Sequence, residues 1–301
     1  MRRFRVGIAG HVVIDRVIGR RLSYESVGGV PTYAGLTVAS LGHTALAISV
    51  IGDDGLAALE RLRGLGVSVE RVRVVRGAKT TRYEIVQLPE GGRRLRLLAR
   101  APDVRAEDLT LELDAMHYGP VAGELRPEDI AVTSRLYRWT ALDPQGLMRA
   151  FDEDGNVRLE VGSLDLETFG SVSVLRLALE ETAALGYAEP SQAAVRLALS
   201  TGRIVAVTAG SRGSFVSDGL RLVRGRTEVE AVDTVGAGDV FGGALLVGLM
   251  ETGDLVYATA LGLAAVDQRV RHAGPRALDG DAIRRAASEL SRKISVSEVR
   301  P

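Results

Sequence analysis

The sequence predicts an α/β protein: a doubly wound, mostly parallel sheet flanked by helices, with a small antiparallel β-sheet lid. The first observation is that short apolar runs alternate with longer segments in which small and apolar residues recur at helical spacing. This alternation is typical of parallel sheets, because a helix must return the chain before the next parallel strand begins. The second is that residues 72–100 alternate charged and apolar residues with period two, as antiparallel strands do.

The expected core elements follow the chain in order. We expect strands at 4–9, 45–51, 115–119, 141–143, 172–175 and 204–208. We expect helices at 30–41, 56–65, 191–200, around 242–250 and at 257–270. Gly42 and Gly66 follow the first two helices, where a residue without a side chain readily closes a helix. Open sheets bind ligands beyond the carboxyl ends of their strands, which is where the glycine-rich segments fall.

The lid is expected from two separate stretches, residues 11–29 and 72–100, whereas residues 1–10, 30–71 and 101–301 form the core. Within the second stretch, strand patterns cover 72–75, 80–88 and 93–98, and Glu90-Gly91-Gly92 supplies a hairpin turn. A sheet that projects beside a ligand site would serve to exclude water. A structural sheet, or one that pairs two copies in a homodimer, is the alternative, and it is compatible with a lid.

Composition excludes several classes of function. The chain of 301 residues carries 38 basic and 38 acidic residues, so its charge indicates neither nucleic acid nor an anionic membrane as a partner. The absence of cysteine removes disulfides, thiolate metal sites and cysteine nucleophiles, and the four histidines lack metal-ligand spacing. No apolar run approaches the ~20 residues that span a bilayer, and the N-terminus lacks a signal-peptide pattern. We therefore expect a soluble cytoplasmic protein.

The most informative segment, residues 231–244, reads Ala-Val-Asp-Thr-Val-Gly-Ala-Gly-Asp-Val-Phe-Gly-Gly-Ala. We expect a strand over 229–232, a Gly-Ala-Gly turn and then an apolar helix. Bare N–H groups at a helix N-terminus bind anions, since unpaired donors and the positive end of the helix dipole point the same way. Asp239 stands among these donors, where a carboxylate suits proton acceptance better than phosphate binding. The segment predicts phosphoryl transfer to a hydroxyl with Asp239 as base; a helix-capping role for Asp239 is the alternative.

Residues 233–241 match at every specified position the pattern Asp-Thr-x-Gly-Ala-Gly-Asp-x-Phe, and so the chain resembles the ribokinase-like (PfkB) carbohydrate kinases, whose C-terminal signature this is. A second segment similar to the family is Gly28-Gly29 with a small-residue helix that ends in Leu41-Gly42, and the similarity covers essentially the whole chain. The resemblance implies a ribokinase-like fold and ATP-dependent phosphotransfer to a hydroxyl of a small polyol. It also implies Mg²⁺ and, as in some members, a monovalent cation at Asp233 and the backbone near Val235. The sequence lacks the Gly-x-x-x-x-Gly-Lys-Ser/Thr pattern of P-loop kinases.

The resemblance implies roles for individual residues. Asp239 is the implied base, and the implied anion hole consists of the N–H groups of Val235, Gly236, Ala237 and Gly238. Asp15 would bind substrate hydroxyls, since a carboxylate accepts two such hydrogen bonds. Gly28 and Gly29 would let the backbone approach the same substrate. The string Val207-Thr208-Ala-Gly-Ser-Arg-Gly213 resembles the nucleotide-binding turn of the family, in which Thr208, Gly210 and Gly213 would lie at the ribose and phosphates.

Two positions depart from the family pattern. Tyr33 stands where sugar-specific members carry Asn, which makes ribose an unexpected acceptor. Leu179-Glu-Glu-Thr182 stands where many members carry Asn-x-x-Glu to organise the waters of Mg²⁺. Glu180 or Glu181 would take over this role, because magnesium keeps several waters and needs few direct protein ligands.

The acceptor is indicated by two loops. Gly119-Pro120-Val121 with Glu124 nearby, and Asp143-Pro-Gln145 with Arg149, look like the inositol kinases of this family, including its archaeal members. Gln145 is therefore an expected substrate ligand, and myo-inositol the best guess for the acceptor. Another sugar, a sugar phosphate or a nucleoside remains an alternative, as does a non-catalytic metabolite-binding member of the fold. Asp-Pro-Gln-Gly is also compatible with a simple polar turn.

Overall fold

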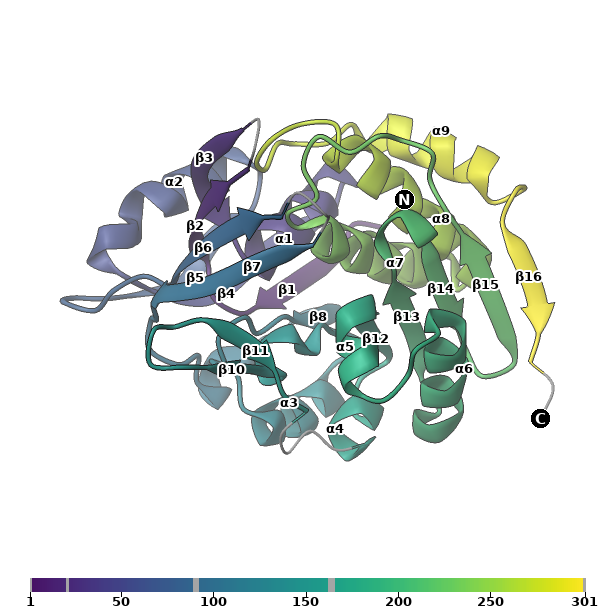
Figure 1. The fold of residues 1–301 in the computed structure, drawn as a ribbon, viewed down its shortest axis with the longest axis horizontal. Coiled ribbons are helices and arrows are strands. Elements are labelled where there is room, and N and C mark those ends of the chain that lie inside the picture. The colour runs from purple at the N-terminus through teal and green to yellow at the C-terminus, as the bar shows by residue number, and fades with distance from the viewer. Residues whose placement is uncertain (1, 20–21, 89–91, 162–165, 300–301) are drawn as a thin grey trace.

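The computed structural model describes residues 2–19, 22–88, 92–161 and 166–299. Within them, a ten-stranded sheet forms the centre of the molecule (Figure 1). Its order is β16 (Ser295–Glu298), β15 (Arg221–Gly225), β14 (Ser214–Ser217), β13 (Ile204–Thr208), β12 (Val174–Ala178), β9 (Trp139–Leu142), β8 (Ala115–Tyr118), β1 (Arg5–Ala9), β4 (Thr44–Gly52) and β5 (Ser68–Val75). All neighbours from β13 to β5 are parallel, whereas β14, β15 and β16 are antiparallel. The doubly wound, mostly parallel sheet expected from the sequence is confirmed.

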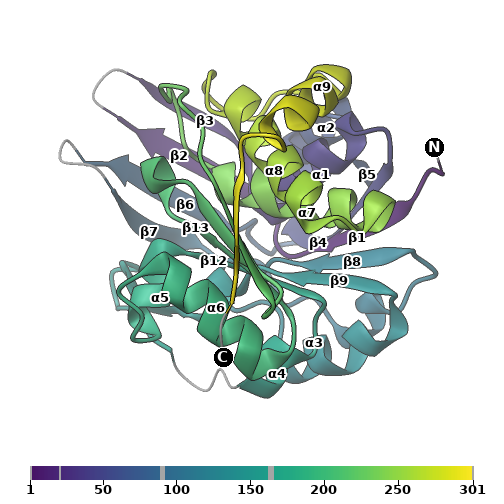
Figure 2. The same ribbon diagram turned by 90° about the vertical axis from the view of Figure 1, so that its right-hand side faces the viewer.

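Helices cover both faces of this sheet (Figure 2). One face carries α1 (Val30–Ser40), α2 (Leu56–Gly64), α7 (Ala237–Thr252), α8 (Leu255–Arg269) and α9 (Gly280–Leu290). The other carries α3 (Pro127–Thr133), α4 (Leu166–Gly170), α5 (Leu179–Ala184) and α6 (Pro190–Thr201). Each layer buries its own apolar cluster against the sheet, as two-sided α/β proteins require. Among the described residues, no helix is long and apolar enough to cross a membrane.

The lid is a four-stranded sheet that projects from one end of the core (Figure 2). Its order is β3 (Ser23–Gly28), β2 (Val13–Ile18), β6 (Arg82–Gln87) and β7 (Arg93–Ala99). The outer pairs are antiparallel, but the central strands β2 and β6 run parallel because they come from two separate stretches of chain. A two-stranded hairpin, β10 (Arg149–Phe151) and β11 (Val157–Leu159), lies along β7, where the N–H of Leu97 donates to Gly155.

Three boundaries differ from the expectation. Residues 72–75 belong to β5 at the edge of the large sheet, because their backbone pairs with that of β4 and not with a lid strand. No strand forms at 229–232, where Val232 donates to the carbonyl of Val270 at 2.7 Å. The helix after the turn begins at Ala237, so Gly238 already lies inside it. The predicted hairpin turn at Glu90-Gly91-Gly92 lies, except for Gly92, outside the described residues.

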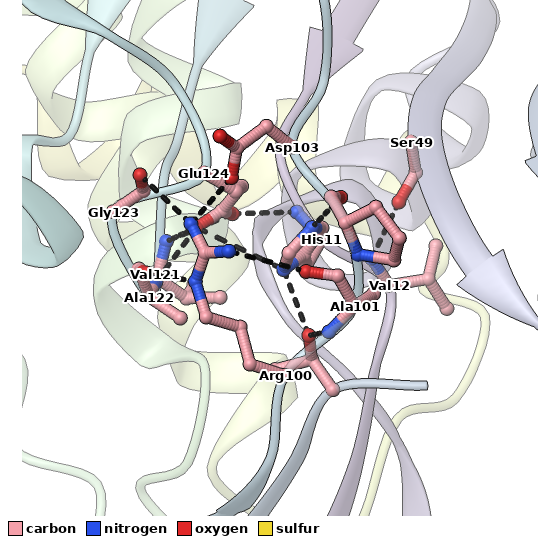
Figure 3. A network of polar contacts seen from close by, with 12 residues as sticks. His11, Val12, Ser49, Arg100, Ala101, Asp103, Val121, Ala122, Gly123 and Glu124 are labelled. Carbon is pink, nitrogen blue, oxygen red and sulfur yellow. Dashed lines mark hydrogen bonds and ion pairs between the residues drawn. The ribbon is translucent and has the colours of Figure 1, made fainter. Parts of the chain in front are cut away.

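One hydrogen-bonded network fixes the lid to the core (Figure 3). The buried carboxylate of Glu124 accepts from the N–H of His11 at 2.7 Å and from two N–H groups of its own loop. The ring of His11 contacts the Thr81 hydroxyl at 2.8 Å, and that hydroxyl accepts from the N–H of Ala101 at 2.9 Å. His11 precedes β2, Thr81 precedes β6 and Ala101 follows β7. The network therefore sets where the lid stands relative to the carboxyl ends of the core strands.

Candidate active site

The glycine-rich turn forms the N-terminus of α7. Gly236 has φ of 75°, a left-handed conformation that favours glycine, and a Cβ there would lie 2.2 Å from the ring of Tyr33. The first bond inside the helix runs from the N–H of Val240 to the carbonyl of Gly236, so the N–H groups of residues 237–239 precede it. The turn thus places the N–H groups of Gly238 and Asp239 at a helix N-terminus, where such groups can bind an anion.

Asp239 lies in the first turn of α7 and is only 9% exposed. Its Oδ1 receives two long polar contacts, 3.4 Å from the Gln145 amide and 3.5 Å from the Arg176 guanidinium. Burial raises the pKa of Asp239 to about 6, although the positive charge of Arg176 acts in the opposite direction. A carboxylate with this pKa is ionised at neutral pH and still basic enough to accept a proton from a hydroxyl at the moment of attack.

A buried ion-pair cluster lies beneath Asp239. Arg176, in the middle of β12, donates to Asp143 Oδ1 at 2.8 Å, and His117 Nε2 lies 3.2 Å from the other oxygen of Asp143. Although burial disfavours its charge, Arg176 and His117 hold the pKa of Asp143 below its ordinary value. A Cβ on Gly238 would come within 2.6 Å of Arg176, so this glycine is what allows the guanidinium to reach the base of the turn.

Gln145, the expected substrate ligand, lies next to Asp239. It lies in a short 3₁₀ turn after β9, and its amide donates to Asp239 while its carbonyl accepts from Arg149 at 2.9 Å. Arg149 in turn donates to the Val121 carbonyl at 2.8 Å and lies over the ring of Tyr83. The two loops that resemble inositol kinases therefore meet at one place.

Asp15 lies on lid strand β2 and is 5% exposed. Burial raises the pKa of Asp15 to about 7, against the opposing charges of Arg149 and of Arg93 at the start of β7. A Cβ on Gly28 would lie 1.8 Å from the Asp15 carboxylate, so Gly28 gives this side chain its space. The negative charge of Asp239 acts in the same direction as burial on the pKa of Asp15, because one carboxylate disfavours the ionisation of another. Gly29, with φ of 83°, begins α1, and a Cβ there would meet the His11 carbonyl at 2.2 Å.

The expectation for Val235 as an anion-hole donor is wrong. Its N–H donates to Asp233 Oδ1 at 3.0 Å, and its carbonyl accepts from Arg269. The N–H of Ala237 is also engaged, with the Thr234 carbonyl at 3.2 Å. Both backbone groups of Val235 therefore have partners inside the protein, and these bonds stabilise the conformation of the turn.

The expected nucleotide-binding turn follows β13. Thr208 ends the strand, Gly210 and Gly213 have φ of 54° and 91°, and a Cβ on Gly213 would lie 2.2 Å from the Gly225 carbonyl. Arg212 and Ser214 from this region also line a cavity of about 610 Å³. The apolar part of the cavity lining includes Phe215, Leu263 and Ile294, and its basic part Arg224, Arg226 and Lys293.

The two candidate magnesium ligands occupy different environments at the start of α5. Glu181 is buried and its Oε2 accepts from the N–H of Ala178 at 2.7 Å, whereas Glu180 is exposed. Both interact electrostatically with Arg93 of the lid. Within the described parts of the chain, no three His, Asp or Glu side chains gather as a metal site. These residues fit an ion held mainly through water and donor phosphates, as Mg²⁺ usually is.

Three members of the site were missed by the sequence reasoning: Asp143 as an ion-pair partner, Arg176 and His117. A signal was present for Arg176, because a charged residue inside the apolar run Val174–Ala178 is costly unless it is paired. The expected strand ended at Leu175, one residue before Arg176, so the arginine was not recognised as part of a buried strand. His117 gave the same signal within β8.

Comparisons with known proteins agree with this fold. A solved structure described as a pyrophosphate-dependent kinase in the ribokinase family, complexed with a pyrophosphate analogue and myo-inositol, superposes with a TM-score of 0.82 at 22% identity, covering 92% of this chain and 99% of that one. The ribokinase of Thermotoga maritima gives a TM-score of 0.71 at 19% identity, with 96% and 99% covered. A probable fructokinase-4 of Arabidopsis thaliana is 27% identical over 74% of this chain and 72% of its own length.

The family assignment rests on the sequence itself. The family model for pfkB carbohydrate kinases matches residues 25–279, which include the Gly28-Gly29 segment, the lid strands from β6 onward and the whole catalytic turn. The likeness to solved structures gives the same fold independently. The chain belongs to the PfkB family of carbohydrate kinases.

Proposed function

We propose that this kinase transfers the terminal phosphoryl group of ATP to a hydroxyl of a small polyol, with myo-inositol as the first candidate. The observation that carries the proposal is the contact of the Gln145 amide with Asp239 at 3.4 Å, together with a second buried carboxylate, Asp15, on lid strand β2. A polyol presents several hydroxyls at once, and two carboxylates and an amide offer acceptors for those hydroxyls. Ring hydroxyls of a cyclitol match this set without any group that would need an aromatic stacking partner.

Each residue then has a distinct task. Asp239 accepts the proton of the attacking hydroxyl, and the unpaired N–H groups at the start of α7, including that of Gly238, stabilise charge on the transferred group. Asp15 and Gln145 orient the acceptor, and Arg93 of the lid adds positive charge near the base. Mg²⁺, held through water by Glu180 or Glu181, would neutralise charge on the donor phosphates.

ATP is proposed as donor because of the cavity lined by residues of β14, β15 and α8. Its volume of about 610 Å³ and its mixed apolar and basic lining suit a nucleoside with phosphates. Pyrophosphate is the second candidate, since the structural neighbours include pyrophosphate-dependent kinases. Fructose is the second candidate for the acceptor, because the related fructokinases of Arabidopsis thaliana and Solanum tuberosum are similar in sequence. A binding protein without activity would have no use for Asp239 as a base.

The first experiment measures phosphoryl transfer with ATP or pyrophosphate against myo-inositol, other inositols, fructose, ribose, sugar phosphates and nucleosides. We expect the highest kcat/KM for ATP with myo-inositol. A higher kcat/KM for fructose would identify fructose as the acceptor in place of myo-inositol. Activity with pyrophosphate but not with ATP would identify pyrophosphate as the donor. No turnover with any pair would favour the non-catalytic alternative.

The second experiment tests the acceptor site through Asp15→Ala. Losing a charge-assisted hydrogen bond to a bound hydroxyl costs about 1.5–3 kcal/mol, so we expect kcat/KM for the acceptor to fall roughly ten- to a hundred-fold. The KM for the donor should stay unchanged. Asp53→Ala, at an exposed aspartate just after β4, is the matched control. An unaltered acceptor KM in Asp15→Ala would move the acceptor away from the lid, toward Gln145 and Arg149.

A further inference from the structure

The group of residues beneath the catalytic turn differs from what the family resemblance implied. Asp233 and the backbone near Val235 were expected to hold a monovalent cation. In the structure this position contains a guanidinium group instead. Arg269, the last residue of α8, has a side chain that is 1% exposed and donates to Asp233 Oδ2 at 2.8 Å and to the Val235 carbonyl at 2.5 Å.

Both carboxylate oxygens of Asp233 and the carbonyl oxygen of Val235 already accept hydrogen bonds. Asp233 Oδ2 also accepts from the Tyr24 hydroxyl at 2.6 Å and from the N–H of Gly274 at 3.0 Å, and Oδ1 accepts from the N–H of Val235. The second nitrogen of the guanidinium, Nη1, donates to the His272 carbonyl at 2.7 Å. An alkali ion would have to displace these donors and would be repelled by a buried positive charge.

The cluster of Tyr24, Tyr33, Asp233, Val235 and Arg269 joins the elements that shape the site. Tyr24 comes from lid strand β3 and Tyr33 from α1. The centre of the Tyr33 ring lies 5.0 Å from the guanidinium carbon of Arg269. The ring of Tyr33 also fills the space beside Gly236, at the start of α7. A positive charge at this point therefore holds the turn, the helix behind it and the lid in one arrangement.

We propose that this kinase needs no monovalent cation, because the Arg269 guanidinium is a resident cation that positions the Val235–Gly238 turn. Arg269 touches neither donor nor acceptor in this arrangement and acts through Asp233 and Val235. The expected effects on reaction rates rest on the proposed function, whereas the expectation that no monovalent cation binds does not.

The first test uses the unmodified protein. Initial rates are measured in choline chloride and in KCl, NaCl and NH₄Cl at equal ionic strength, about 100 mM, where a specifically bound ion would be close to saturation. We expect rates within about twofold of one another and unfolding temperatures within about 1 °C. Activation by K⁺ of fivefold or more, or a specific rise in unfolding temperature, would overturn the proposal. If no donor and acceptor pair reacts, the proposed function fails and the unfolding measurement still decides the binding question.

The second test removes the guanidinium through Arg269→Met, with Arg271→Met as the matched control at an exposed arginine two residues along. We expect kcat to fall about tenfold or more with an acceptor KM within about twofold, because the turn and not the acceptor site is disturbed. KCl or dilute guanidinium chloride should restore part of the loss, since a cavity of about 320 Å³ lined by Arg269, His272 and Gly274 adjoins the cluster.

Wild-type kcat in a folded Arg269→Met protein would refute the positioning role. Arg269→Lys retains the charge and should lie between the wild type and Arg269→Met. If Arg269→Met does not fold, Arg269→Lys is used for the test instead. A loss of kcat that KCl does not change supports the proposal that Arg269 is the resident cation. A loss of kcat that KCl fully restores argues against the proposal.

Discussion

Asp233 and Asp239 stand on opposite sides of the Gly-Ala-Gly turn, each facing a buried arginine, yet their environments differ. Asp233 accepts four hydrogen bonds, from Tyr24, Arg269, Gly274 and Val235, all at 3.0 Å or less. Asp239 receives only two contacts, at 3.4 and 3.5 Å. Although burial opposes the ionisation of Asp233, the hydrogen bonds from Arg269, Tyr24 and Val235 hold its pKa below the ordinary value. Burial raises the pKa of Asp239 to about 6.

The difference teaches how one turn can contain both a structural anion and a base. Burial disfavours the charge of both carboxylates, so the number and length of their hydrogen bonds decide the outcome. Four short donors stabilise the ionised form of Asp233, three of them at Oδ2 and one at Oδ1. Asp239 keeps lone pairs available for a hydroxyl proton, because Arg176 is held at a distance by its shorter bond to Asp143.

The largest expected effect is on turnover in Asp239→Asn. The amide keeps the shape of the side chain but cannot accept the proton, so kcat should fall at least ~100-fold, the lower range for loss of a general base. Donor KM should stay close to the wild type, and the variant should remain folded. Steady-state kinetics with the best donor and acceptor pair checks this, and near-normal turnover would show that Asp239 is not the base.

Asp233→Asn should instead reduce stability. The substitution leaves the Arg269 charge buried without its counter-ion, and breaking one side of a buried ion pair costs about 3–5 kcal/mol. Chemical denaturation of Asp233→Asn beside Asp239→Asn measures the contrast directly. Equal stability of the two variants would mean that hydrogen-bond saturation does not distinguish these carboxylates.

Gly238→Ala should produce a smaller, kinetic effect. The added Cβ would lie 2.6 Å from Arg176, whose guanidinium is fixed by Asp143, so either the arginine or the turn must move. We expect kcat/KM to fall about tenfold in a protein that still folds, since the donors of the turn are displaced. Gly64→Ala is the control, because a Cβ there meets nothing within 4 Å. Unchanged kcat/KM would separate Arg176 from the chemistry.

The glycine-rich turn and the helix after it could be predicted from the sequence because they are local structure. Gly236, Gly238 and Asp239 are neighbours in the chain, and a helix N-terminus places them without help from other elements. Gln145 was expected from the resemblance of its loop to the inositol kinases of the family, and the structure places this loop directly after β9.

The partners of these residues could not be predicted in the same way. Arg176 meets Asp143 only because β12 lies next to β9 in the sheet, and Arg269 meets Asp233 only because α8 packs against α7. Pairings of this kind depend on topology and register, which apolar patterns do not specify. The same limit explains the four residues at 72–75, whose alternation fits a lid strand as well as the edge strand that they form.

The smallest expected effect is the pH dependence of stability. A carboxyl group whose folded-state pKa is raised stabilises the protein most below its ordinary pKa, and this contribution is lost as pH rises through the folded value. Asp239 therefore penalises the wild type increasingly up to and beyond pH of about 6. Between about pH 5 and 8, Asp239→Asn should gain roughly 1 kcal/mol relative to the wild type. Asp233, whose pKa is lowered, stays ionised across this window, so the stability deficit of Asp233→Asn should be constant there and change only in more acidic solution. Denaturation of the three proteins at several pH values tests both signs, and a constant gap for Asp239→Asn would mean that its carboxyl group titrates at an ordinary pKa.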